Sequence, residues 1–185
     1  MTNSKGSGRK TIFLDRDGTI IIDKVYLNDP DQIEYLPDVF EALRLLRDAG
    51  YQFVIVTNQS GIARRLVTME NLDEIHRRIQ AEFSKHGIHF SGFYYAPYSV
   101  ESRHPIRKPN PGMLLRGAED HRANLESSWM VGDRITDVIA GSRAGCRTVL
   151  LAGTEAVDPN AATEAQPTIV SNGLLEAANE ILRLS

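Results

Sequence analysis

The sequence predicts a three-layer α/β domain built on a parallel sheet with helices on both faces. Apolar stretches of strand length alternate along the chain with amphipathic stretches of helix length, which is the order of a βαβ fold. The strand-like stretches are continuous apolar runs, so both faces of the sheet are expected to be covered. Right-handed crossovers between successive strands then place the helices in two outer layers.

The first two predicted strands flank a helix. Residues 11–15 and 51–57 are short apolar runs, which favour buried strands. Residues 38–49 between them carry apolar side chains at helical spacing, with Pro37 at the start and Gly50 at the end, both typical of helix boundaries. This segment therefore reads as one β-α-β unit.

The middle of the chain continues the alternation. Residues 68–86 carry apolar side chains on one helical face, and a threonine at the first position can cap the helix. Residues 92–96 predict a short strand, and residues 97–110 a polar loop. A helix over residues 112–121 follows, and the proline before it is typical of a helix start.

The last third of the chain repeats the pattern with shorter elements. Apolar runs bounded by Gly, Pro and polar residues predict strands, and apolar residues at helical spacing predict helices. The expected elements are a strand over 128–131, a helix over 136–144, a strand over 147–151, a loop over 154–166, a strand over 168–170 and a helix over 174–184.

Composition limits the class of protein. The chain has 185 residues, enough for one compact domain, which we expect over residues 11–185 after a disordered lead-in at residues 1–10. A net charge of −3 argues against a general nucleic-acid binder. Cys146 is the only cysteine, so no intrachain disulfide forms. Without a signal-like or membrane-length apolar run, we expect a cytoplasmic protein with no membrane partner, and we expect a monomer.

Polar residues capable of chemistry follow four of the predicted strands. In an open parallel sheet, ligands bind beyond the carboxyl ends of the strands, so these residues are expected to meet. Asp15 and Asp17 are two residues apart directly after the first apolar run, and in an extended segment their side chains would point the same way. The other three groups are Thr57, Asn58, Gln59 and Ser60; Arg107 and Lys108; and Asp133, Arg134 and Asp137.

These residue types suit phosphoryl transfer. Mg²⁺ prefers hard oxygen ligands, and Asp15, Asp17 and Asp133 supply carboxylates for it. Asp15 could attack phosphorus as a nucleophile, while Asp17 could protonate the leaving oxygen and later deprotonate water. Thr57 could hold the phosphoryl oxygens, and Lys108 could neutralise their charge and keep Asp15 ionised.

Four motifs resemble those of the haloacid dehalogenase superfamily of phosphatases. In chain order they are Asp-Arg-Asp-Gly-Thr at residues 15–19, Val-Thr-Asn-Gln-Ser-Gly at 56–61, Arg-Lys-Pro at 107–109 and Gly-Asp-Arg-Ile-Thr-Asp at 132–137. Longer matches around them are similar to the branch of histidinol phosphatases and D-glycero-D-manno-heptose-1,7-bisphosphate phosphatases. The resemblance implies a Rossmann-like domain with a minimal cap and Mg²⁺-dependent hydrolysis of a small phosphorylated sugar, with the 7-phosphate of the heptose bisphosphate removed.

The resemblance also implies individual roles. Asp15 would be the nucleophile and Asp17 the acid/base, and Asp15, the Asp17 carbonyl and Asp133 would bind the metal. Arg107 would read the substrate. Further substrate contacts are expected at Asp23, Tyr26, Asn58, Gln59, Ser60 and Arg134, the last standing where these enzymes often carry Lys.

One segment departs from the family pattern. The relatives commonly carry structural zinc ligands in the loop before Arg-Lys-Pro, whereas this chain has no cysteine before Arg107 and keeps one imidazole there, His104. A single imidazole cannot build a tetrahedral zinc site, so we expect no zinc. Because this loop shapes the pocket in the relatives, Tyr98, Arg103 and His104 are candidates for that role here.

Alternative interpretations stay open at this point. Asp137 either belongs to the metal site or caps the helix that begins near it, and residues 58–60 either contact substrate or only form a turn. Histidinol phosphate, other sugar phosphates and a nucleic-acid 3′-phosphate are alternative substrates, the last disfavoured by the net charge. A non-enzymatic alternative is a receiver-like phospho-acceptor domain, but a receiver has its acceptor Asp after the third strand, where this chain has Ala96 and Pro97. A degenerate binding protein is disfavoured by the complete carboxylate set.

Overall fold

The computed structural model describes residues 8–152 and 162–185 of the chain. Most of the predicted lead-in at residues 1–10 and most of the predicted loop at 154–166 lie outside these residues. The described part contains a six-stranded parallel sheet in the order β3-β2-β1-β4-β5-β6. Its strands are β1 (Thr11–Leu14), β2 (Gln52–Asn58), β3 (Phe90–Ala96), β4 (Trp129–Gly132), β5 (Arg147–Leu151) and β6 (Ile169–Ser171).

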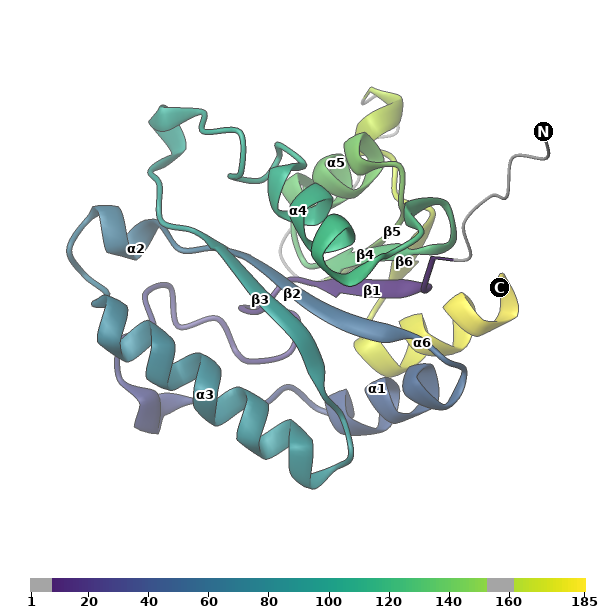
Figure 1. The fold of residues 1–185 in the computed structure, drawn as a ribbon, viewed down its shortest axis with the longest axis horizontal. Coiled ribbons are helices and arrows are strands. Elements are labelled where there is room, and N and C mark those ends of the chain that lie inside the picture. The colour runs from purple at the N-terminus through teal and green to yellow at the C-terminus, as the bar shows by residue number, and fades with distance from the viewer. Residues whose placement is uncertain (1–7, 153–161) are drawn as a thin grey trace.

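The helices cover both faces of this sheet, as the sequence predicts (Figure 1). The larger helices on one face are α1 (Val39–Asp48), α3 (Met69–Lys85) and α6 (Leu174–Arg183), and those on the other are α4 (Gly112–His121) and α5 (Ile135–Ala144). Strands added outward from β1 in both directions with right-handed crossovers produce this two-sided arrangement. The fold is therefore the three-layer, Rossmann-like one that was expected.

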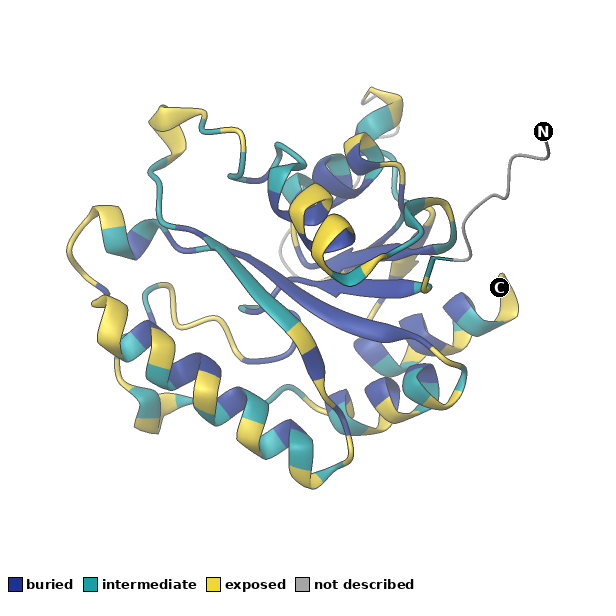
Figure 2. Cartoon of the chain, in the orientation of Figure 1, coloured by how far each residue is buried: buried dark blue, intermediate teal, exposed yellow. Residues whose placement is uncertain are grey.

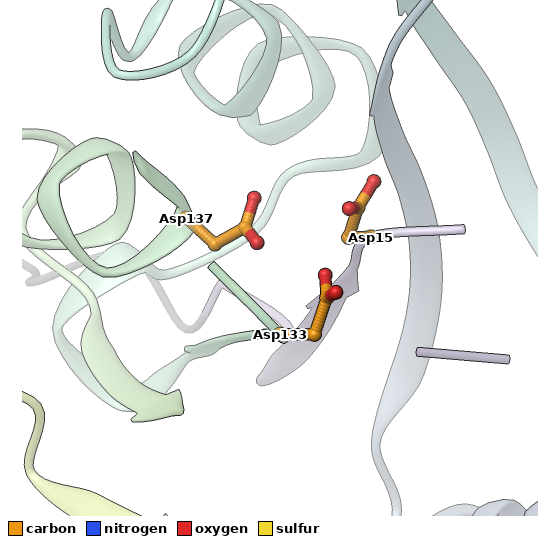
Figure 3. A group of neighbouring side chains, drawn as sticks. All are labelled: Asp15, Asp133 and Asp137. Carbon is orange, nitrogen blue, oxygen red and sulfur yellow. The ribbon is translucent and has the colours of Figure 1, made fainter. Parts of the chain in front are cut away.

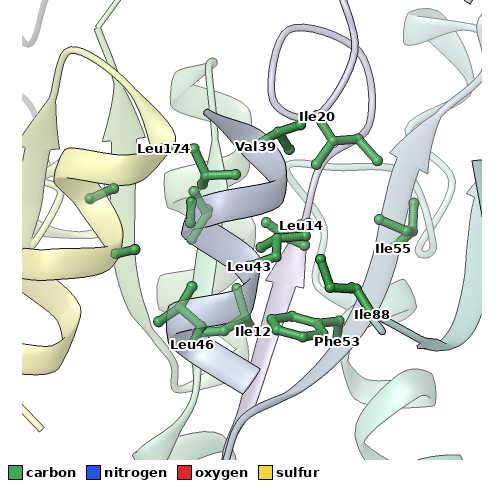
Figure 4. Close-up of a cluster of buried hydrophobic side chains, with 14 of the residues drawn as sticks. Ile12, Leu14, Ile20, Val39, Leu43, Leu46, Phe53, Ile55, Ile88 and Leu174 are labelled. Carbon is green, nitrogen blue, oxygen red and sulfur yellow. The ribbon is translucent and has the colours of Figure 1, made fainter. Parts of the chain in front are cut away.

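Each face of the sheet has its own apolar core. The larger core lies under α1, α3 and α6, where Leu43 and Leu46 of α1 pack towards Ile12 and Leu14 of β1 (Figure 4). The smaller core joins Phe13 of β1 to residues of α4 and α5. The central strands are buried along their whole length, whereas the outer helix faces are exposed (Figure 2). This burial explains why the strands are continuous apolar runs in the sequence.

The structure adds short elements that the sequence pattern does not predict. Among the described residues these are the one-turn helix α2 (Ser60–Ala63) and the 3₁₀ turns η1 (Pro30–Gln32), η2 (Val100–Ser102), η3 (Leu125–Ser127) and η4 (Thr163–Ala165). Such elements are too short for helical periodicity to show. Strand β3 also begins two residues earlier than predicted. The expected cap of α3 is confirmed, because Thr68 Oγ1 accepts a hydrogen bond from the Asn71 amide.

Within residues 8–152 and 162–185, no helix has the length and apolarity needed to cross a bilayer.

Candidate active site

A cavity of about 680 Å³ opens beyond the carboxyl ends of the central strands. Strands β1 and β4 are neighbours here, and the chain order reverses between them, which is the position where open α/β sheets bind ligands. The lining residues come from all four predicted motif groups and from the segment after β1. The predicted site residues among them are Asp15, Asp17, Asp23, Tyr26, Thr57, Asn58, Gln59, Ser60, Arg107, Lys108, Arg134 and Asp137.

Three carboxylates from two strand ends and one helix form an acidic group, of which Asp15 and Asp137 line this cavity and Asp133 does not. Asp15 follows β1, Asp133 follows β4 and Asp137 lies in the first turn of α5, and one oxygen of each lies within 4.8 Å of the others. Figure 3 shows the three side chains pointing toward a common centre. All three are buried, so their mutual repulsion is only weakly screened by water.

Two glycines allow the backbone to approach this group closely. Gly18 has φ of 78°, and a Cβ there would lie 2.3 Å from Asp133 Oδ2. A Cβ on Gly132 would lie 2.2 Å from Asp137 Oδ2. Any larger residue at either position would displace a carboxylate, so both positions of the motifs require glycine for steric reasons.

Lys108 is the buried cation of the group. Its side chain is 2% exposed, and its Nζ lies 2.9 Å from Asp15 Oδ1 and 2.6 Å from Asp137 Oδ1. It also donates to the carbonyl of Val56 at 2.7 Å. Burial by itself lowers the pKa of Lys108, but the charges of Asp137 and Asp15 outweigh it and raise the pKa. Lys108 therefore stays protonated and balances one of the negative charges.

The remaining negative charge is poorly compensated. Burial raises the pKa of Asp133 to about 7, with further contributions from the charges of Asp15 and Asp137. Burial likewise raises the pKa of Asp137 to about 6, although the charge of Lys108 opposes that shift. Oδ1 of Asp133 is buried and accepts no hydrogen bond from any described residue.

A divalent cation fits this arrangement. A buried carboxylate oxygen with no donor, two neighbouring carboxylates and a glycine-lined approach form a set of hard oxygen ligands of the type Mg²⁺ prefers. Asp15 and Asp133 are the residues that would hold it. Asp137 was expected either to belong to the metal site or to cap a helix. It lies in the acidic group, and its Oδ2 also accepts a hydrogen bond from the Arg134 amide at the start of α5.

The side chain of Asp17 is not part of the acidic group. Strand β1 ends at Leu14, so the alternation that would align Asp15 with Asp17 does not extend to them. The carboxylate of Asp17 instead accepts hydrogen bonds from the Arg16 guanidinium, the shortest at 2.8 Å, and from Gln59 Nε2 at 2.9 Å. Burial raises the pKa of Asp17, and the Arg16 charge opposes this shift.

The residues at the end of β2 and directly after it hold other parts of the site in place. Asn58 accepts from the Lys108 amide and donates to the Lys108 carbonyl, each at 3.0 Å, so its amide group fixes that segment. Gln59 Nε2 also donates to Thr57 Oγ1 at 2.9 Å, and Thr57 is 1% exposed. Ser60 lies on the cavity wall at the first residue of α2.

Charged and aromatic side chains form the outer part of the cavity. Arg134 pairs with Asp23 at 3.0 Å, which joins the segment after β1 to the segment after β4. The guanidinium of Arg64 lies 5.9 Å from the ring centre of Tyr26. Arg107 donates to the carbonyl of Tyr98 at 3.0 Å. Four of the predicted substrate-binding residues, Asp23, Tyr26, Arg107 and Arg134, thus line the same cavity.

The segment that departs from the family pattern is ordered by an aromatic stack. The rings of Tyr98 and His104 lie 3.7 Å apart and 11° from parallel. Arg103 between them has φ of 48° and lines the cavity together with Arg107. Of the three residues suggested for this loop, Arg103 therefore reaches the cavity, and the other two contact each other.

Two buried residues at the site were not singled out from the sequence. Arg16 is 1% exposed and lies between Asp17 and His76. His76 of α3 is 8% exposed and therefore buried. A signal was present, because His76 falls on the apolar face of α3, four residues after Leu72 and three before Ile79.

Comparisons with known proteins find similar phosphatases. A family model described as HAD-hydrolase-like matches residues 105–177. D-glycero-β-D-manno-heptose-1,7-bisphosphate 7-phosphatase of Helicobacter pylori (strain ATCC 700392 / 26695) is 36% identical over 143 residues, which is 77% of this chain and 83% of the relative. The enzyme of the same name from Vibrio cholerae serotype O1 is 34% identical over 185 residues, covering 95% of this chain and 98% of its own.

A solved structure is also similar over nearly the whole chain. It is the crystal structure of D,D-heptose 1,7-bisphosphate phosphatase from B. bronchiseptica complexed with magnesium and phosphate. The two folds match with a TM-score of 0.81 at 28% sequence identity, covering 95% of this chain and 99% of the other.

Proposed function

Because this chain belongs to the HAD-like hydrolases, in the branch of the heptose bisphosphate phosphatases, it is a phosphatase, and we propose that it removes the 7-phosphate from D-glycero-D-manno-heptose 1,7-bisphosphate. The observation that carries the proposal is the convergence of Asp15, Asp133 and Asp137 on one centre, with Lys108 against Asp15. This arrangement supports the binding of a phosphate group beside a metal cation and its attack by a carboxylate.

The proposed reaction has two steps. A carboxylate oxygen of Asp15 attacks phosphorus, the phosphorus–oxygen ester bond breaks, and Asp17 gives its proton to the leaving sugar oxygen. Asp17 then takes a proton from water, and the resulting hydroxide attacks the phosphorus of the aspartyl phosphate. Inorganic phosphate leaves and Asp15 is regenerated.

The surrounding residues stabilise charge during both steps. Lys108, whose Nζ lies 2.9 Å from Asp15 Oδ1, would offset the charge of the phosphoryl group, and Thr57 would hold a phosphoryl oxygen at the end of β2. Mg²⁺ held by Asp15 and Asp133, with the backbone carbonyl of Asp17, would offset the charge of the phosphoryl group. The magnesium and phosphate in the B. bronchiseptica structure support this choice of cofactor.

The outer cavity suits a polar substrate with a second charge. Arg107, Arg134 and Asp23 offer donors and an acceptor for hydroxyl and phosphate groups, and Tyr26 offers an aromatic face. The relatives' substrate, a heptose carrying two phosphates, has groups of these kinds. We therefore include these residues in the proposed substrate site.

The decisive experiment is a substrate panel with matched variants. Phosphate release is measured from both anomers of the heptose bisphosphate, from other sugar phosphates and from histidinol phosphate, with Mg²⁺ and with EDTA. We expect the heptose bisphosphate to have the highest kcat/KM and EDTA to abolish turnover. Asp15→Asn should be inactive, while Asp48→Asn, an exposed control on α1, should match the wild type. Full activity in Asp15→Asn, or no Mg²⁺-dependent release from any sugar phosphate, contradicts the proposal.

The same proposal covers the setting in which the enzyme works. We propose a monomeric, cytoplasmic enzyme whose domain spans residues 11–185, with no zinc and no nucleic-acid or membrane partner. The absence of cysteine before Arg107 and the Tyr98–His104 stack support the zinc part. Light scattering and metal analysis of the purified protein test it, and a stoichiometric zinc content or a stable dimer would overturn it.

A further inference from the structure

A buried arginine lies directly behind the proposed acid/base. Arg16 stands between Asp15 and Asp17 in the sequence, and its side chain is 1% exposed. Its Nε and Nη2 atoms contact both carboxylate oxygens of Asp17, at 2.8 to 3.3 Å. A two-pronged contact of this kind fixes the plane of the carboxylate as well as its position.

The opposite edge of the same guanidinium contacts a histidine from another layer of the fold. Arg16 Nη1 lies 3.3 Å from Nε2 of His76 on α3. A guanidinium can only donate, so Nε2 must accept, and the imidazole carries its proton on Nδ1. Burial, together with the charge of Arg16, lowers the pKa of His76 to about 3, which keeps the ring neutral and able to accept.

The histidine ring is itself held in place. It stacks on Phe93 of β3 with ring centres 4.8 Å apart and 27° between the planes. Gln59 Nε2 also donates to Asp17 Oδ2 at 2.9 Å. The carboxylate is thus fixed from α3 through Arg16 and from the end of β2 through Gln59.

We propose that Arg16 and His76 are positioning residues, which orient Asp17 for proton transfer to the leaving oxygen. The inference rests on the proposed function, because it takes Asp17 as the acid/base. A general acid works only when its proton is aimed at the leaving atom, and a small displacement lowers the rate steeply. Without the acceptor on His76, the guanidinium loses a hydrogen bond that holds it in place, and the plane of the Asp17 carboxylate is no longer fixed.

The test separates acid positioning from general stability. His76→Leu removes the acceptor, and His76→Gln keeps an oxygen that can accept from Arg16. With a sugar phosphate, whose leaving alkoxide needs a proton, we expect His76→Leu to lower kcat by about tenfold or more with KM changed less than about twofold. His76→Gln should recover most of the loss.

A second substrate provides the readout that a merely structural role would not move. 4-Nitrophenolate leaves without protonation, so the first-turnover burst from 4-nitrophenyl phosphate should be nearly the same in His76→Leu and the wild type. The matched control is His86→Leu at the end of α3, because His86 also stacks on a phenylalanine ring, Phe40, at 4.0 Å. It should change neither substrate's rate.

The possible outcomes are distinguishable. Equal losses for both substrates in His76→Leu, or no loss for the sugar phosphate, overturn the inference. Failure of His76→Gln to recover activity also overturns it. If Asp17→Asn keeps full activity on the sugar phosphate, the assignment of Asp17 in the proposed function is wrong. If Asp17→Asn is inactive while His76→Leu is fully active, only the positioning inference fails.

Discussion

The acidic group should make the metal-free enzyme less stable than a variant that cannot bind the metal. Asp133 is buried, its Oδ1 accepts no hydrogen bond from any described residue, and the charges of Asp15 and Asp137 lie beside it. Replacing it by asparagine removes one buried negative charge with little change in volume. We therefore expect Asp133→Asn to be inactive, yet more stable than the wild type in EDTA at pH 8.

The pKa of Asp133 sets the size of this effect. It rises from 3.8 in the unfolded chain to about 7 in the folded protein, roughly three units, and each unit corresponds to about 1.4 kcal/mol. The ionised carboxylate thus destabilises the metal-free fold by at most ~4 kcal/mol above pH 7. A net gain of about 2 kcal/mol is expected, because the buried amide of asparagine needs new hydrogen bonds. As the pH falls from 7 towards 4, the folded carboxyl takes up its proton and the difference should disappear.

Urea unfolding at pH 8 and pH 4, in EDTA and in Mg²⁺, measures all of these terms. In Mg²⁺ at pH 8 the order should reverse, because a cation that binds the folded wild type stabilises it by mass action and the variant gains much less. Asp48→Asn on α1 serves as the exposed control and should behave as the wild type in each buffer. A variant that is less stable than the wild type in EDTA at pH 8 would refute this account of the acidic group.

Three further predictions follow from individual contacts. Gly132→Ala should lower kcat at least about tenfold, because its Cβ would lie 2.2 Å from Asp137 Oδ2, whereas Gly173→Ala, with nothing within 4 Å, should be neutral in activity assays. Leu43→Ala in the larger core should lower the free energy of unfolding by about 2 to 5 kcal/mol, measured in urea, while kcat at 25 °C stays unchanged. Between pH 6.5 and pH 5 the wild type should lose about 2 kcal/mol more stability than His76→Gln. The pKa of His76 is about 3 in the folded protein and 6.5 in the unfolded chain, so the unfolded chain binds the proton first. Equal losses in both proteins would contradict this.

The layered fold was predictable because its central strands are buried on both faces. The residues of β1 and β4 are all buried, and such burial permits only apolar runs of the type visible in the sequence. At the edge of the sheet the signal weakens, since in β3 only Phe90 and Ala96 are buried and Ser91 is exposed. That is why the predicted strand begins late at this edge. Helix α2 is one turn long, too short for its periodicity to be read.

Only part of the site could be predicted from the sequence, for a similar physical reason. Residues that follow strands could be placed together because the carboxyl ends of parallel strands meet at one edge, and Asp15, Thr57, Lys108 and Asp137 do line one cavity. No comparable rule predicts from the sequence which side chains of the helix layers contact residues of the sheet. Arg16 and His76 are 60 positions apart, and their meeting depends on how α3 packs on the sheet.

The two aspartates after β1 show why identical residue types cannot be assigned by spacing alone. An extended segment would turn Asp15 and Asp17 to the same side, but the strand ends at Leu14 and the chain turns at Gly18, where φ is 78°. One carboxylate then meets Lys108 and the other meets Arg16. The two carboxylates therefore lie in different environments: burial raises the pKa of Asp17, and the charge of Arg16 opposes this shift. The two carboxylates therefore differ in their partners, which spacing in the sequence does not show, and this difference supports the separate roles proposed for them.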